Sequence, residues 1–84
     1  MSVRLHPHAT ARLIERGATQ AEVIATVSGG VTFPAQFSRT GFRRNFPFNA
    51  EWQGKLYATK KVEAIAVKEN ENDWLVITVI VKFF

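Results

Sequence analysis

The stretch Trp74-Leu-Val-Ile-Thr-Val-Ile-Val-Lys-Phe83 decides the fold, because it is the longest run of β-branched and aromatic residues in the chain. Such residues pack well on a pleated surface and lose rotamer freedom in a helix, so the run predicts one strand near the centre of a sheet. Alternate side chains point to opposite faces. A wholly apolar face, expected to be the core wall, would carry Leu75, Ile77, Val79, Val81 and Phe83. The other face, where we expect a site, would carry Trp74, Val76, Thr78, Ile80 and Lys82.

Length and composition limit what the rest of the chain can build. The 84 residues are enough for one domain, residues 1–84, with one modest core. The chain has no cysteine, which excludes a disulfide framework and a thiolate metal site. No apolar run approaches the roughly 20 residues of a membrane span, and we expect a cytoplasmic protein without a membrane partner. The net charge of +4 favours a polyanionic partner, nucleic acid first.

Two helices are expected near the N-terminus. Pro7 suits a first helical position, and Gly17 suits the left-handed cap that ends a helix over about Pro7 to Arg16. Thr19 and Glu22 have the spacing of a capping box, which predicts a second helix ending at Ser28-Gly29-Gly30.

Beyond Gly30 the pattern becomes extended. Short strands are expected at Val3–His6 and Val31–Phe33, followed by a strand over Phe42–Phe48 that is an edge or ends at Pro47, because proline cannot donate to a ladder. Asn49 to Gly54 is expected to be a turn, and one or two strands should cover 55–68. The fold class is therefore α+β, with two N-terminal helices on one face of a curved, mainly antiparallel sheet of about four strands.

The stretch His8-Ala-Thr-Ala-Arg-Leu-Ile-Glu-Arg-Gly17 resembles the opening of a family of small bacterial proteins of unassigned function, whose pattern is His-Ala-x-x-Arg-(Leu/Met)-x-Glu-Arg-Gly. The acid-capped helix start at Thr19-Gln-Ala-Glu-Val23 follows at the family's spacing. The family's late strand, Val-(Ile/Val)-Thr-Val, is similar to Val76-Ile-Thr-Val79, whereas residues 31–60 match loosely. The family is similar in layout to the RelE and BrnT toxins and to barnase-like ribonuclease toxins.

The resemblance implies a small toxin of the toxin–antitoxin type, acting as a metal-independent ribonuclease or as a translation inhibitor. It implies RNA as a partner, such as tRNA or ribosome-associated mRNA, together with a cognate antitoxin or immunity protein. It requires no cofactor. The motif positions that carry over to this chain are His8, Arg12, Glu15, Arg16 and Thr78.

Metal-free RNA cleavage needs a base for the ribose 2′-OH, an acid for the 5′-oxygen, and cations for the developing phosphorane charge. His8 is the candidate base or acid, since imidazole titrates near neutrality. Arg12 lies one turn further on and would hold a phosphate, while Thr78 would orient it. These three are the predicted catalytic residues. The residues themselves, without the resemblance, suggest substrate-binding roles for Arg43, Tyr57 and Lys60.

Each candidate also has a purely structural interpretation. His8 would cap the helix start, Arg12 and Glu15 would be solvated surface charges, and Arg16 would bond the last helical carbonyls. Thr78 would simply be a good strand former. His6 and His8 have no carboxylate at ligand spacing beside them, so no metal site is expected.

Two functions from different classes follow. The first is the ribonuclease or translation inhibitor, which requires His8, Arg12 and Thr78 to share one cleft. The alternative is a non-catalytic protein-binding module of the same fold, in which these residues scatter and the strand Phe42–Phe48 exposes an apolar patch or a free edge. That edge would also allow a homodimer. A nucleic-acid binder without chemistry is a third, weaker interpretation.

Overall fold

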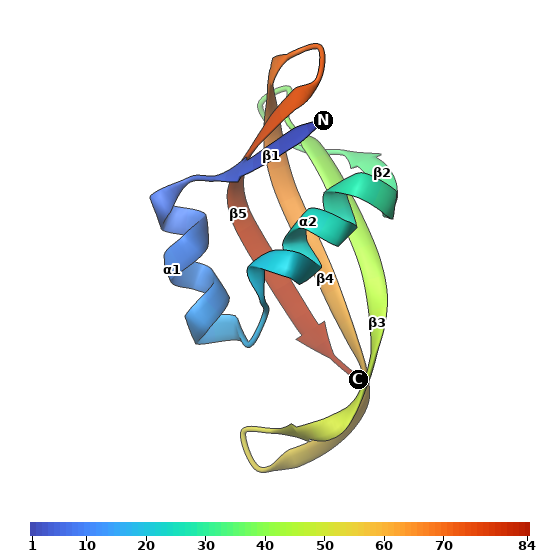
Figure 1. Ribbon diagram of the computed structural model, residues 1–84. Helices are drawn as coiled ribbons and strands as arrows, with labels where there is room; N and C mark the ends of the chain where they lie inside the picture. The colour runs from blue at the N-terminus through green and yellow to red at the C-terminus, as the bar shows by residue number, and fades with distance from the viewer.

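A computed structural model describes residues 1–84 as an α+β fold with a curved, open sheet (Figure 1). The elements in chain order are β1 (Ser2–Leu5), α1 (Pro7–Arg16), α2 (Gln20–Gly29), β2 (Val31–Pro34), β3 (Thr40–Trp52), β4 (Lys55–Asn70) and β5 (Asp73–Phe83). The strand order is β1-β5-β4-β3-β2. Four strands are antiparallel as expected, and β1 adds a fifth that runs parallel to β5.

Both helices have the predicted bounds because their end signals are local. Gly17 ends α1 with φ 74°, and the N–H of His8 donates to Nδ1 of the His6 cap (3.1 Å). Thr19 and Glu22 form the expected capping box at the start of α2. The helices are ten residues each, and neither has the length and apolar character needed to cross a membrane.

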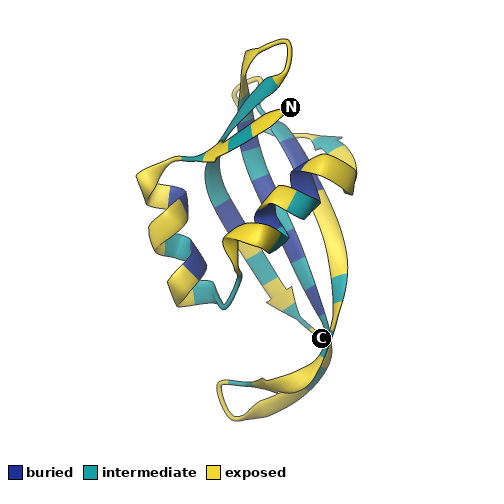
Figure 2. Cartoon of the chain, viewed as in Figure 1, coloured by how far each residue is buried: buried dark blue, intermediate teal, exposed yellow.

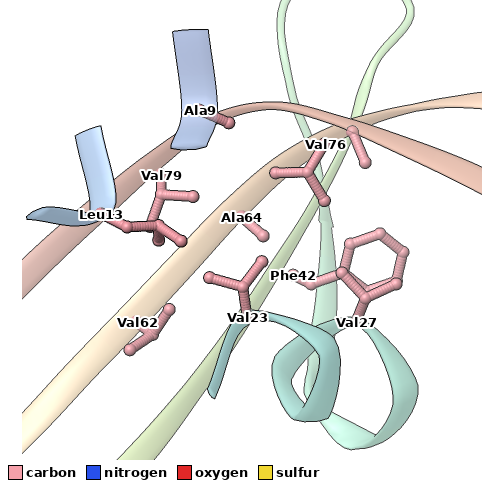
Figure 3. Packing of buried hydrophobic residues seen from close by; sticks show 10 residues of the cluster. Ala9, Leu13, Val23, Val27, Phe42, Val62, Ala64, Val76 and Val79 are labelled. Carbon is pink, nitrogen blue, oxygen red and sulfur yellow. The ribbon is translucent and has the colours of Figure 1, made fainter. Parts of the chain in front are cut away.

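The core lies between the helices and one face of the sheet (Figures 2 and 3). Ala9 and Leu13 of α1 and Val23 and Val27 of α2 point into it. The sheet contributes small or β-branched residues and one aromatic ring, namely Phe42, Val62, Ala64, Ala66, Val76 and Val79. Because both helices pack on this face, the other face of the sheet carries neither of them.

The predicted alternation of β5 is confirmed for residues 78–83 and wrong for residues 74–76, because a β-bulge at Ile77 changes its phase. Ile65 of β4 pairs with Thr78, but the next residue, Ala66, pairs with Val76, so Ile77 is an extra residue. Val76 and Val79 therefore both enter the core. Thr78 is placed on the face without helices. A regular strand would have put Val76 and Val79 on opposite faces.

The β3–β4 hairpin is longer than the sequence indicates. β3 continues through Pro47 to Trp52, and only Gln53 and Gly54 form the turn, both with positive φ. A bulge between Pro47 and Ala50 bends the strand where Asn49 takes φ 46°. The predicted turn over Asn49 to Gly54 is therefore a bulge and a two-residue turn.

Strand β3 has a free edge over much of its length. β2 pairs with it only from Thr40 to Arg43, so no strand covers the outer side beyond Arg43. Pro47 lies in this unpaired part of the strand edge, where its missing N–H removes no ladder hydrogen bond. The strand around Pro47 was predicted to be an edge or to end there, and the first of these alternatives is confirmed.

Two adjacent glycines at the end of α2 differ in what a methyl group would meet. A Cβ on Gly30 would lie 2.6 Å from the carbonyl oxygen of Arg43 and closer still to that of Thr26, whereas on Gly29 it would meet only the end of the Arg44 side chain at 3.3 Å. We expect Gly30→Ala to lower the free energy of unfolding by about 1–3 kcal/mol. Gly29→Ala, the matched control in urea denaturation, should cause no loss. Equal stability of the two variants would contradict this packing.

Candidate functional site

A group of charged residues lies on the uncovered face, meaning the face of the sheet opposite to α1 and α2. The register pairs Arg43 with Glu63, Lys61 with Lys82, and Glu63 with Ile80. Glu63 and Lys61 alternate along β4 with the buried Val62 and Ala64, so their side chains leave the sheet on the uncovered side. The basic cluster, as we call it, consists of Arg43, Lys61, Lys82 and the carboxylate of Glu63.

The charges of the basic cluster are not neutralised by ion pairs. Elsewhere Glu69 pairs with Arg4 (2.6 Å), Glu15 with Arg12 (3.0 Å) and Glu22 with Lys60 (2.9 Å). None of the four cluster residues forms an ion pair within 4.0 Å. Three cations around one carboxylate leave an excess of two positive charges on this face. Such an excess attracts a polyanion.

A neighbouring ring holds one of these cations on the face. The guanidinium of Arg43 lies 5.2 Å from the centroid of the Phe33 ring, within the range of a cation–π contact. The Phe33 ring in turn covers Gly41 of the adjacent strand, where any Cβ would overlap it. The Phe33 ring therefore packs over Gly41, and the guanidinium of Arg43 lies against this ring.

The predicted catalytic residues do not share a pocket. His8 and Arg12 lie on α1, which packs on the core face through Ala9 and Leu13, whereas Thr78 is on the uncovered face. The guanidinium of Arg12 binds Glu15, and no pocket in the structure is lined by His8, Arg12 or Thr78. Convergence of these three side chains on one cleft is therefore not observed.

Thr78 and Arg43, which the sequence analysis placed in different groups, instead occur on the same face. Thr78 pairs with Ile65, one position along β4 from the pairing of Ile80 with Glu63. Its hydroxyl is thus a diagonal neighbour of the Glu63 carboxylate. Thr78 on β5 and Arg43 on β3 therefore flank β4 on this face.

Lys60 serves the fold, and its predicted role in substrate binding disagrees with its burial. The residue is only 6% exposed, and its ammonium donates to the Gly17 carbonyl and to Glu22, both at 2.9 Å. The rings of Phe48 and Phe83 lie 5.2 and 5.9 Å from it. Lys60 therefore ties β4 to the turn between the helices, and its burial leaves it little access to a ligand.

Tyr57 belongs to an aromatic cluster near the tip of the β3–β4 hairpin. Its ring lies 5.6 Å from that of Phe83, which also stacks on Trp52 at 5.1 Å and meets Phe48 at 5.0 Å. Trp52 lies against Gly17, where a Cβ would come within 2.7 Å of the ring. This cluster anchors the hairpin to the helical turn, so Tyr57 has a structural role that the sequence did not reveal.

Arg16 also has a partner that was not expected. Its Nη1 donates to the carbonyl oxygen of Val79 on β5 (2.7 Å) rather than to the end of its own helix. β1 covers β5 only as far as Val76, so this carbonyl lies on an edge without a partner strand. The motif arginine thus satisfies an edge carbonyl of the central sheet.

Lys61 and Glu63 were not predicted as candidate residues, and Lys82 was predicted only to lie on the face where a site was expected. A signal for Lys61 and Glu63 was present, because Lys61-Val-Glu-Ala64 alternates charged residues with small apolar ones. Their meeting with Lys82 depends on the register beyond the Ile77 bulge. Nothing local in the sequence marks that bulge.

No protein-family model, characterised protein or solved structure matches the chain significantly. The resemblance to a toxin family remains a prediction that rests on the motif residues.

Lys60 and Lys61 make a matched pair, because they are adjacent in β4 and point to opposite faces. Lys60→Met keeps the alkyl volume but leaves Glu22 without its cation. We expect it to lower the free energy of unfolding by about 3 kcal/mol, the low end for a broken buried pair because Glu22 retains some solvent contact. Lys61→Met should change stability by less than about 0.5 kcal/mol. Urea denaturation checks both, and a stable Lys60→Met protein would refute the structural role.

Proposed function

We propose that the protein is a small toxin-type protein directed at RNA, a metal-independent ribonuclease or translation inhibitor, and that it binds RNA on the uncovered face. The observation that carries the proposal is the basic cluster, in which Arg43, Lys61 and Lys82 surround Glu63 without ion pairs. The net charge of +4 and the opening motif support the same class.

The cluster would supply two of the three groups that cleavage of RNA needs, a base and cations, and water would supply the proton for the leaving 5′-oxygen. The Glu63 carboxylate would take the proton of a ribose 2′-OH, and the 2′-oxygen would attack the adjacent phosphorus. The cations would stabilise the negative charge that develops on the phosphorane oxygens. The bond from phosphorus to the 5′-oxygen would then break, with a proton from water completing the leaving hydroxyl, and a 2′,3′-cyclic phosphate would remain.

A protein that neutralises this activity would be acidic. An antitoxin or immunity protein with carboxylates opposite Arg43, Lys61 and Lys82 would compete directly with RNA for the uncovered face. This expectation follows from the charge of the cluster and gives the proposed partner a chemical description.

The proposal is tested by induced expression in bacteria with growth and RNA integrity as readouts. We expect the wild type to slow growth and to yield RNA fragments ending in 2′,3′-cyclic phosphate. Glu63→Gln keeps the shape of the side chain but removes its basicity, so cleavage should fall by at least about a hundredfold. Lys61→Met should reduce it as well, without loss of stability.

His8→Ala and Arg12→Ala serve as the comparison with the site expected from the motif. If the basic cluster performs the chemistry, both variants should remain as active as the wild type. If they are inactive while Glu63→Gln retains activity, the site lies at α1 and the assignment to the uncovered face is wrong. Intact RNA and normal growth with the wild type would refute the ribonuclease proposal itself.

A second candidate is a non-catalytic protein-binding module. The free edge of β3 beyond Arg43 favours it, together with exposed apolar residues such as Val31 and Ile80 beside the cluster. The edge could receive a strand from a partner or from a second copy of the chain.

Salt dependence separates RNA binding from this module. If RNA neutralises the cluster, log K should fall steeply with log salt, and Lys82→Met should lessen the slope by about one. If the chain forms dimers and binds RNA weakly, with an affinity that does not depend on salt, the protein-binding module is favoured.

A further inference from the structure

The loop between β2 and β3 exposes an aromatic ring in an unfavourable backbone conformation. Phe37 has φ 60° and Ser38 has φ 58°, and the N–H of Arg39 donates to the Gln36 carbonyl (3.3 Å). This is the geometry of a type I′ turn, which glycine and asparagine adopt readily and phenylalanine does not. Phe37 therefore strains the backbone that it occupies.

Packing does not compensate for this strain. The Phe37 side chain is 83% exposed, so the fold gains little by burying it. Glycine or asparagine at this position would suit the turn better and would remove an apolar surface from water. A strained and exposed aromatic residue that the fold does not need indicates a role in binding.

The surroundings of Phe37 define what it could bind. An open pocket is lined by Phe37 together with Ala35, Gln36, Arg39 and Ile65. Ile65 belongs to the uncovered face and pairs with Thr78, so the pocket adjoins the face that carries the basic cluster. The Arg39 guanidinium lies 5.7 Å from the centroid of the Phe37 ring and forms no ion pair.

The geometry points to a binding site for one unpaired nucleobase at Phe37, an inference that rests on the proposed RNA-directed function. The base stacks on the exposed ring, as bases do on aromatic side chains of proteins that bind single strands. The Gln36 amide offers a donor and an acceptor for the base edge. Arg39 and the basic cluster hold the phosphates on either side. The ligand class is therefore single-stranded RNA, not duplex.

Substitution of Phe37 by glycine should change stability and RNA affinity in opposite directions. Phe37→Gly removes the strain of a side chain at positive φ, so the melting temperature of the variant should equal or exceed that of the wild type. Its affinity for a short single-stranded RNA should fall by about five- to a hundredfold, the measured scale of one base–aromatic stack. Phe37→Trp should keep the affinity. Leu56→Ala removes another large, 79% exposed apolar side chain far along the hairpin and should leave binding unchanged.

The experiment titrates each variant of the full chain with the oligonucleotide carrying a fluorescent base analogue and, separately, with its duplex. We expect the wild type to quench the fluorescence of the base analogue in the single strand. Phe37→Gly should not quench it. Unchanged affinity and quenching in Phe37→Gly would overturn the inference, and if Lys61→Met still weakened binding the proposed function would stand. Absence of any RNA binding by the wild type would overturn both.

Discussion

One extra residue in the last strand determines what each face of the sheet carries. The bulge at Ile77 lets Val76 and Val79 enter the same core, and it puts Thr78 and Ile80 on the other side with Lys82. Without it, strict alternation would bury either Val76 or Val79 but not both. If Val76 stayed in the core of a regular strand, every later side chain would change face and Lys82 would move to the helix side. The basic cluster exists because this bulge fixes the register.

The helices were predictable from the sequence and the strand register was not, for a physical reason. Pro7, Gly17 and the Thr19–Glu22 box act within one turn of chain, so their effect is visible in the sequence. A bulge satisfies contacts between segments far apart, here β5 with α1 and β4, and has no local signature. For this reason the fold class and the faces of residues 78–83 were predicted, whereas the faces of residues 74–76 and the cluster around Glu63 were not.

Adjacent lysines on β4 show how little residue type alone reveals. Lys60 is buried with Glu22, the Gly17 carbonyl and two aromatic rings, whereas Lys61 carries an unpaired charge on the uncovered face. Lys60, together with Arg43 and Tyr57, was predicted to bind substrate, and Lys61 was not. The two roles depend on which face of the strand each residue occupies, and that follows from the helices packing on one side.

The size of the chain explains why one face stays uncovered. Two ten-residue helices, each about 15 Å long, can cover one face of a five-stranded sheet but not both. In an ordinary sheet with one face in solvent, every second residue of a strand points to that face and is polar. This one instead mixes apolar residues such as Ile65 and Ile80 with cations that have no ion pair, at a cost in solvation and self-repulsion. Stability does not require that mixture, and an anionic ligand with apolar rings, such as unpaired RNA, complements both of its components.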